Sequence, residues 1–178
     1  MLLTKLNVSQ VRNLQAVSID CNPTANFIYG VNGSGKTSLL EAIFLLGRGR
    51  SFKHRDLKLV INNQADQLVV SANLYSPLSK TNHQLGIMRS VKGEFEARCD
   101  GKNLQASVEL AKELPIQLVD AHSFSLLEGG PLQRRQFLDW GVFHVEHCWH
   151  IAADVLSETC MLACEWETDT LGETLLRA

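Results

Sequence analysis

The segment Gly30–Thr37 is the part of the sequence that most limits what the chain can fold into. It reads Gly-Val-Asn-Gly-Ser-Gly-Lys-Thr and fits the pattern G-x-x-x-x-G-K-[ST] in full. A short apolar run, 27–30, precedes it, and a run of helix formers, 37–46, follows it. This order predicts a loop between a strand and the N-terminus of a largely buried helix.

Each residue type in this loop suits the binding of phosphates. Glycines allow backbone conformations and a close approach that a Cβ would block. Successive N–H groups can then point into one concavity, next to the positive end of the helix dipole. Lys36 offers a point charge to the β- and γ-phosphates, and the Thr37 hydroxyl suits Mg²⁺. The loop therefore predicts a nucleoside triphosphate with Mg²⁺ as the ligand, bound by Gly30, Val31, Asn32, Gly33, Ser34, Gly35, Lys36 and Thr37.

Apolar and polar residues alternate through much of the chain, which is the period of a half-buried strand. Leu3–Val11 and the residues around Val17 and Ile19 predict a hairpin with Arg12-Asn13 at its tip. Further on, an antiparallel meander is predicted over 67–74, 85–91, 94–99 and the neighbourhood of Leu104, with Asp100-Gly101 as a hairpin turn.

Helices and one more strand complete the expected elements. Gly47 and Gly49 are expected to end the helix that follows the glycine-rich loop. A short helix is predicted over 108–114 and a long one from Leu132 to about His147, with a buried strand over 116–119 between them.

The order of these elements separates the classes of nucleotide-binding protein. A small-molecule kinase would have a doubly wound parallel sheet, and the antiparallel pattern over 67–104 disfavours that alternative. A GTPase usually carries an Asn-Lys-x-Asp motif, which the sequence lacks. Two strands before the loop, joined at Arg12, are typical of ATPase heads of the ABC and SMC type. The expected fold class is therefore α/β, with a mixed α+β sheet.

Charge is concentrated in one short stretch of a nearly neutral chain, whose formal net charge is −2. A basic cluster of this kind indicates a partner that carries phosphates, although a solvated loop explains it equally well. The five basic residues fall within eleven positions and are Arg48, Arg50, Lys53, Arg55 and Lys58.

The sequence also predicts a cellular location. No apolar run approaches the roughly 20 residues of a membrane span, and the N-terminus lacks the pattern of a secretory signal. The five cysteines are an odd number and are widely spread. Reduced thiols in the cytoplasm are the simplest interpretation.

Three segments resemble the RecF family of bacterial recombination mediator ATPases. They are Val11–Leu14, Asn26–Phe52 and Leu126–His147, and the last contains the run Gly-Gly-Pro-x-x-Arg-Arg-x-Phe-Leu-Asp, which is close to diagnostic of the family. The resemblance covers about residues 1–148. It implies an SMC-like ATPase head lobe with an antiparallel meander over 1–128, followed by the start of a helical domain over 129–148.

The resemblance also implies a function. RecF proteins bind double-stranded DNA and single-strand/double-strand junctions when ATP is bound, and they act with RecR and RecO to direct RecA loading at gaps. Their processes are DNA repair, replication restart and the SOS response, with ATP-dependent homodimers and a weak, DNA-stimulated ATPase activity. The resemblance places Arg12 and Asn13 beside the nucleotide. The candidate DNA contacts are Arg48, Arg50, Lys53, Arg55, Arg134 and Arg135.

The sequence departs from the family in three places. Ala121-His122 stands where RecF proteins typically have proline and an acid, and Asp120 is interpreted as the end of a core strand. Residues 149–178 form an acidic tail in place of a basic helix, which we interpret as a truncated or frameshifted reading frame. The ABC signature and Walker B acids of the family are not found. ATP binding without hydrolysis is therefore expected, and no ATP-driven homodimer.

Two alternatives and one further cluster complete the set of predictions. The alternatives are a non-functional fragment whose loop is a relic of folding and, less favoured, a small-molecule kinase. Several histidines and cysteines near the end of the chain have a composition that can bind zinc, but the histidine positions match ordinary RecF sequence, so no metal site is predicted there. These residues are His144, His147, Cys148, His150, Cys160 and Cys164.

Overall fold

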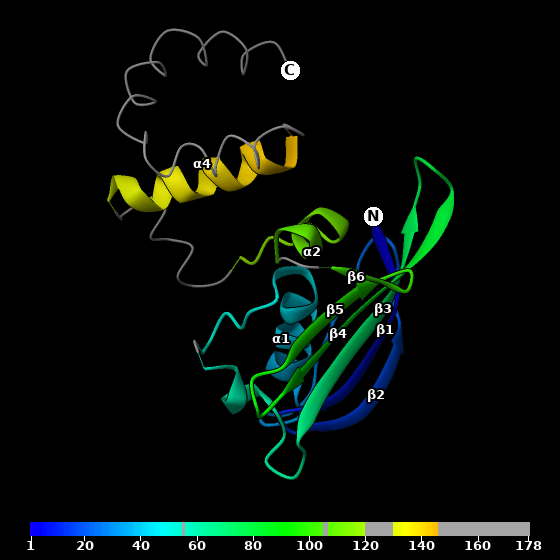
Figure 1. Cartoon of the computed structure of the whole chain (residues 1–178), viewed down its shortest axis with the longest axis vertical. Coiled ribbons are helices and arrows are strands. Elements are labelled where there is room, and N and C mark those ends of the chain that lie inside the picture. Colours follow the sequence, from blue (N-terminus) through cyan, green and yellow to red (C-terminus); the bar gives the residue numbers. More distant parts are fainter. Residues whose placement is uncertain (55, 105–106, 120–129, 146–178) are drawn as a thin grey trace, which may run out of the picture. The chain divides into compact units, whose positions relative to one another are not determined.

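A computed structural model describes residues 1–54, 56–104, 107–119 and 130–145 (Figure 1). The chain divides into two compact units, Met1–Leu118 and Val119–Ala178. The first unit is built on a six-stranded sheet in the order β2-β1-β3-β4-β5-β6, and all neighbouring strands in it are antiparallel. The strands are β1 (Leu2–Val11), β2 (Leu14–Asp20), β3 (Gln67–Ser76), β4 (Thr81–Ser90), β5 (Phe95–Cys99) and β6 (Lys102–Leu104).

The core of the first unit lies between the sheet and helix α1 (Lys36–Arg48), which packs against β1, β3 and β4. Helix α2 (Ser107–Glu113) in turn packs against α1 and β6. Alternate residues of β3 are buried because side chains alternate between the two faces of a strand. The buried apolar residues of β1, β3 and β4 are Leu6, Val8, Val11, Leu68, Val70, Ala72, Leu74, Leu85 and Ile87.

The predicted hairpins and meander are confirmed. Arg12 and Asn13 lie between Val11 and Leu14, which pair with each other across the β1–β2 hairpin. Asp100 and Gly101 both have positive φ, 49° and 79°, and they connect β5 to β6 as the Asp-Gly dipeptide predicts. The antiparallel pairing also agrees with the argument against a small-molecule kinase.

The predicted helices are confirmed, with one correction to their ends. Helix α4 (Pro131–Val145) forms where a long helix was expected, in the second unit of the chain. Helix α1 ends at Gly49, whose φ of 64° is left-handed and whose N–H donates to the Leu45 carbonyl at 2.7 Å. Gly47 does not end the helix. It lies inside α1, and because it lacks a side chain, Ile116 has room to pack against the helix at this position.

Two predicted strands are wrong. Residues 27–30 and 116–119 belong to no helix and to no strand of the sheet. Phe27, Tyr29 and Val119 are 90%, 92% and 78% exposed, which is the reverse of what a buried strand requires. A strand forms only where a neighbour completes its hydrogen bonds, and in the described residues no neighbour pairs with these two stretches.

The structure also bears on two other predictions. In the described part of the chain, none of the helices has both the length and the apolar character of a membrane span. Several residues singled out from the sequence lie outside the described residues, or have side chains that do. They are Arg55, Asp120, Ala121, His122, His144, His147, Cys148, His150, Cys160, Cys164 and the tail 149–178.

Candidate nucleotide site

The glycine-rich loop leads directly into the N-terminus of α1. Three of its residues have positive φ: Gly30 at 152°, Gly33 at 84° and Gly35 at 96°. Gly35 is the N-cap of α1, and a Cβ at this position would lie 2.6 Å from Leu14 Cδ2. The backbone conformation therefore favours glycine at Gly35, and a Cβ there would also displace the end of the Leu14 side chain. The loop residues 31–34 are exposed and thus accessible to a ligand.

Lys36 and Thr37 occupy the first turn of α1. The Lys36 ammonium donates hydrogen bonds to the carbonyl oxygens of Gly30 and Val31, at 2.8 Å each. This contact holds the positive charge against the loop that the motif predicts to bind phosphates. Thr37 is exposed, so its hydroxyl is accessible to a hard cation, and such cations prefer oxygen ligands. The structure thus brings the loop, the ammonium and the hydroxyl together at one end of the helix.

Asn13 connects the tip of the β1–β2 hairpin to this loop. Its Nδ2 donates to the Gly33 carbonyl oxygen at 2.9 Å, and its Oδ1 accepts from Ser38 Oγ at 2.7 Å. One side chain therefore fixes the hairpin against both the loop and the first turns of α1. Asn13 therefore lies against the glycine-rich loop, and its place beside a nucleotide stays a prediction.

Arg12 is held in place from three directions. Its φ of 51° is left-handed, a conformation that costs a residue with a side chain about 1–2 kcal/mol. Its N–H donates to the Val60 carbonyl at 2.8 Å, and its carbonyl accepts from Asn62 Nδ2 at 2.7 Å. Its guanidinium binds the Glu41 carboxylate through Nε and through Nη2, the latter at 3.0 Å from Oε1. Strained residues of this kind persist where their surroundings fix them, often at functional sites.

Glu41 is a residue of the site that sequence reasoning missed. The sequence favours a surface or structural role for it, but its side chain is fully buried in α1 and accepts hydrogen bonds from both Arg12 and Ser51. Burial raises its pKa, but the Arg12 and Ser51 hydrogen bonds and the Arg12 and His54 charges outweigh burial, so the pKa lies below its ordinary value. The available signal was a single acid inside an otherwise apolar helix run.

A cavity of about 510 Å³ lies beside the hairpin tip. Its size falls within the range of small-molecule sites, and its lining is rich in amide side chains that can both donate and accept hydrogen bonds. Residues 59–64 contribute to this lining but carry no recognised binding motif. The lining residues are Arg12, Asn13, Gln15, Leu59, Ile61, Asn62, Asn63 and Gln64.

The predicted DNA contacts fall on two separate units. Arg50 and Lys53 are exposed in the segment after α1, whereas Arg48 is half-buried. Burial, with the charge of Arg50, lowers the pKa of Arg48. Arg134 and Arg135 are exposed on α4, in the second unit. Among the described candidates, Arg50 and Lys53 are the best placed in the first unit to contact a phosphate chain.

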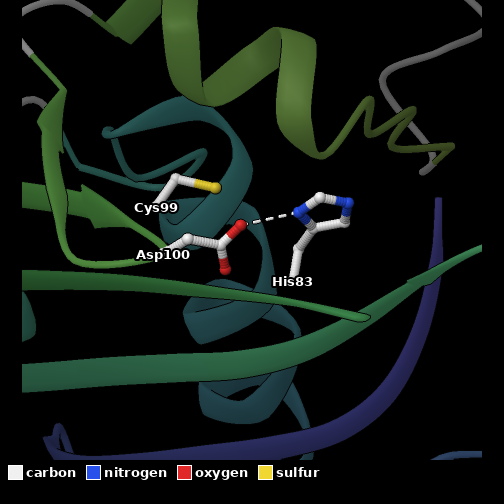
Figure 2. A group of neighbouring side chains, drawn as sticks. All are labelled: His83, Cys99 and Asp100. Carbon is white, nitrogen blue, oxygen red and sulfur yellow. Dashed lines mark hydrogen bonds and ion pairs between the residues drawn. The ribbon is translucent and has the colours of Figure 1, made fainter. Parts of the chain in front are cut away.

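A second group of ligand-type side chains lies at the turn between β5 and β6. The ligand atoms of His83, Cys99 and Asp100 lie within 4.8 Å of one another (Figure 2). The His83 ring already contacts Asp100 Oδ2 through Nδ1, at 2.7 Å, and Thr81 Oγ1 through Nε2, at 2.8 Å.

The chemistry of Cys99 favours a structural role for this group. Burial, with the nearby charges of Glu113 and Asp100, raises the pKa of the Cys99 thiol to about 11. The thiol is therefore protonated near neutral pH, and the other two side chains of the group already contact each other through His83 Nδ1 and Asp100 Oδ2. We assign the group a structural role in the β4–β5–β6 segment.

Comparisons with known proteins find relatives of this chain both in sequence and in fold. The family model for the N-terminal domain of RecF, RecN and SMC proteins matches residues 2–130. The DNA replication and repair protein RecF of Pseudomonas fluorescens Pf0-1 is 50% identical over 147 residues, 82% of this chain and 40% of the relative. RecF of Azotobacter vinelandii is 46% identical over 154 residues, 84% of this chain and 42% of the relative. The chain thus spans about 40% of the length of these curated relatives.

Solved structures agree with the predicted fold class. A structure of the recombination mediator RecF with ATP has a TM-score of 0.77 at 24% identity and covers 88% of this chain and 43% of that one. A structure from work on ATP-driven dimerization of SMC ATPases has a TM-score of 0.63 at 17% identity, and the match covers 79% of this chain and 99% of that one. The predicted ATPase head fold and the resemblance to the N-terminal half of RecF are both confirmed. By the family model and these relatives, the chain belongs to the RecF/RecN/SMC N-terminal domain family.

Proposed function

We propose that this chain is the ATP-binding lobe of a RecF-type protein of DNA replication and repair. The observation that carries the proposal is the loop at Gly30–Gly35, with Lys36 held across it and Asn13 fixed to it by a hydrogen bond. The names of the curated relatives supply the process, since they are DNA replication and repair proteins. Solved RecF structures with ATP support the choice of nucleotide.

Each part of the site has a proposed role in holding ATP and Mg²⁺. The loop N–H groups and Lys36 would hold the phosphates, and the Thr37 hydroxyl would hold Mg²⁺, which neutralises phosphate charge when it is bound. The base and ribose would enter the 510 Å³ cavity, where amide side chains can meet their donors and acceptors.

The partners of the family extend the proposal. Arg50 and Lys53, with Arg48, Arg55, Arg134 and Arg135 in support, would contact the phosphates of double-stranded DNA and of single-strand/double-strand junctions. The processes would be repair, replication restart and the SOS response in the cytoplasm. RecR and RecO would act beside the protein in RecA loading.

We propose that the chain binds ATP without turning it over. Phosphoryl transfer needs a group that orients the attacking water. In the described residues Glu41 is the buried carboxylate, and both of its oxygens are already engaged, by Arg12 and Ser51. Phosphate release by the chain with ATP and Mg²⁺ is therefore expected at the background rate. Turnover that disappears in Lys36→Ala would contradict this expectation.

The Lys36→Ala substitution tests the proposed function. A hydrogen bond from a charged group contributes about 1.5–3 kcal/mol, so ATP binding should weaken roughly tenfold to a hundredfold. The measurement is titration with a fluorescent ATP analogue in the presence of Mg²⁺. Lys92→Ala, at an exposed position in another turn, is the matched control and should bind as the parent chain does. Equal affinity in Lys36→Ala and Lys92→Ala would refute the assignment of this loop to ATP.

A further inference from the structure

One buried carboxylate joins two regions that the proposed function uses separately. Glu41 binds the Arg12 guanidinium on the side of the hairpin tip and the cavity. The same carboxylate accepts from the hydroxyl of Ser51. Ser51 lies after α1 in residues 50–54, which we call the basic segment because they contain Arg50 and Lys53. Ser51 Oγ also accepts the backbone N–H groups of Lys53, at 3.0 Å, and His54, at 3.1 Å. A chain of hydrogen bonds therefore runs from Arg12 through Glu41 to the backbone of the basic segment.

The burial of Glu41 makes these contacts depend on one another. Its side chain is fully buried, and a buried carboxylate is costly unless its oxygens are paired. Oε1 is shared, since it accepts from both Arg12 Nη2 and Ser51 Oγ. A movement of Ser51 therefore changes the electrostatic environment of the guanidinium. In the same way, a movement of Arg12 changes the contact that fixes the turn at Ser51.

Arg12 is suited to respond to such a change. It holds a left-handed backbone conformation, so its position depends on the contacts around it rather than on local preference. A guanidinium has five N–H donors, and Glu41 takes one at Nε and one at Nη2. The same side chain lines the cavity in which we place the base and ribose.

We propose that Glu41 is a positioning residue that couples the occupancy of the ATP site to phosphate contact at the basic segment, through Arg12 on one side and Ser51 on the other. The inference rests on the proposed function, because it requires that the chain bind both ATP and DNA. Coupling of this kind is reciprocal: if DNA at Arg50 and Lys53 tightens ATP binding, ATP tightens DNA binding by the same factor. The hydrogen bonds that carry this coupling run from Arg12 through Glu41 to Ser51, and the Ser51 hydroxyl is the group that joins Glu41 to the basic segment.

Removal of the Ser51 hydroxyl tests the inference. Ser51→Ala leaves the Glu41–Arg12 pair and every basic side chain in place, whereas Glu41→Gln removes the buried charge and can unfold the chain. Ser18→Ala is the matched control, because it also removes one serine hydrogen bond, to Asn7 Oδ1 at 2.8 Å on the exposed β1–β2 hairpin. A thermal unfolding curve for each variant confirms that it is folded.

The measurement is the affinity for a fluorescent ATP analogue, with and without a saturating blunt DNA duplex. In the parent chain and in Ser18→Ala, DNA should tighten ATP binding about fivefold or more. In Ser51→Ala, the affinity for ATP alone should stay within about twofold of the parent value, and the DNA effect should fall towards none. If Ser51 had a role in folding alone, Ser51→Ala would not keep its affinity for ATP while losing the effect of DNA on that affinity.

Two outcomes would overturn the inference and leave the proposed function standing. One is a DNA effect on ATP affinity in Ser51→Ala equal to that of the parent chain. The other is a parent chain that binds ATP, depends on Lys36 and binds DNA, yet shows no effect of one ligand on the other. A third outcome, ATP binding unchanged by Lys36→Ala, refutes the proposed function and the coupling together.

Discussion

Gly47 shows how one missing side chain fixes the packing of α1. A Cβ at this position would lie 2.4 Å from Ile116 Cδ1 and 2.7 Å from the Leu114 carbonyl oxygen. Such contacts force neighbouring groups to move, which costs about 1–3 kcal/mol in a packed interior. Gly47→Ala should therefore lower the free energy of unfolding by that amount, although alanine is the better helix former. Urea denaturation is the measurement.

A second glycine provides the control for this prediction. A Cβ at Gly86, in β4, would meet Ser71 Cβ at 3.7 Å, an ordinary van der Waals distance. Gly86→Ala should change the free energy of unfolding by no more than about 0.5 kcal/mol. If Gly47→Ala were as stable as the parent chain, Ile116 would not pack against α1 as described.

The position of the glycine-rich loop before α1 could be predicted from the sequence, because the motif fixes both residue type and spacing. Lys36 begins α1 and Asn13 lies at the tip of the predicted hairpin, whereas their contact with a nucleotide stays a prediction. Glu41 and the cavity could not be predicted, since their roles depend on contacts between distant segments. Glu41 and Arg12 are 29 positions apart, and Arg12 and Asn62 are 50 apart. No local pattern specifies such a contact.

Among the secondary-structure elements, β4 and the β5–β6 turn share a contact that depends on pH. Asp100 accepts the Gln84 backbone N–H at 2.7 Å and contacts the His83 ring. These hydrogen bonds, with that of Gln84 the larger effect, lower the pKa of Asp100 below its ordinary value of about 3.9. A carboxyl whose pKa is lowered by folding adds stability above its ordinary pKa. This stability is lost as the pH falls through the folded pKa.

The Asp100→Asn substitution tests this contact. Asparagine tolerates positive φ and keeps the shape of the side chain, so it removes the charge and replaces one acceptor oxygen by an amide donor. At pH 7 the variant should unfold at a lower urea concentration than the parent chain, and the difference should shrink and then vanish as the pH falls through the lowered folded pKa of Asp100. Asp66→Asn, at an exposed position, is the control and should follow the parent chain. A difference that persisted at low pH would show that the charge is not the cause.

The two wrongly predicted strands show where periodicity fails as a guide to elements. An apolar run is compatible with a buried strand, but a strand also needs a neighbour to complete its hydrogen bonds. The meander supplies its own neighbours through short turns, so β3 to β6 could be predicted from local pattern. Residues 27–30 and 116–119 have no such neighbour in the described sequence. Both stretches are apolar, as the sequence shows, but neither pairs with a strand of the sheet.

For the chain as a whole, the unpaired residues 27–30 leave large apolar side chains exposed next to the glycine-rich loop. Phe27, Tyr29 and Val31 are 90%, 92% and 79% exposed. Singly exposed apolar side chains are common on protein surfaces. We therefore expect these three side chains to be accessible to solvent in the folded chain.

The double substitution Phe27→Ser/Tyr29→Ser distinguishes an exposed surface from a buried strand. Because both rings are exposed, the free energy of unfolding should change by no more than about 0.5 kcal/mol, and binding of a hydrophobic dye to the folded chain should fall. Leu68→Ala, at a fully buried position of β3, is the comparison and should cost about 2–5 kcal/mol. Urea denaturation and dye fluorescence are the two measurements. A loss of stability comparable to that of Leu68→Ala would show that residues 27–30 are packed in the core, and the sheet would then need a partner strand for them.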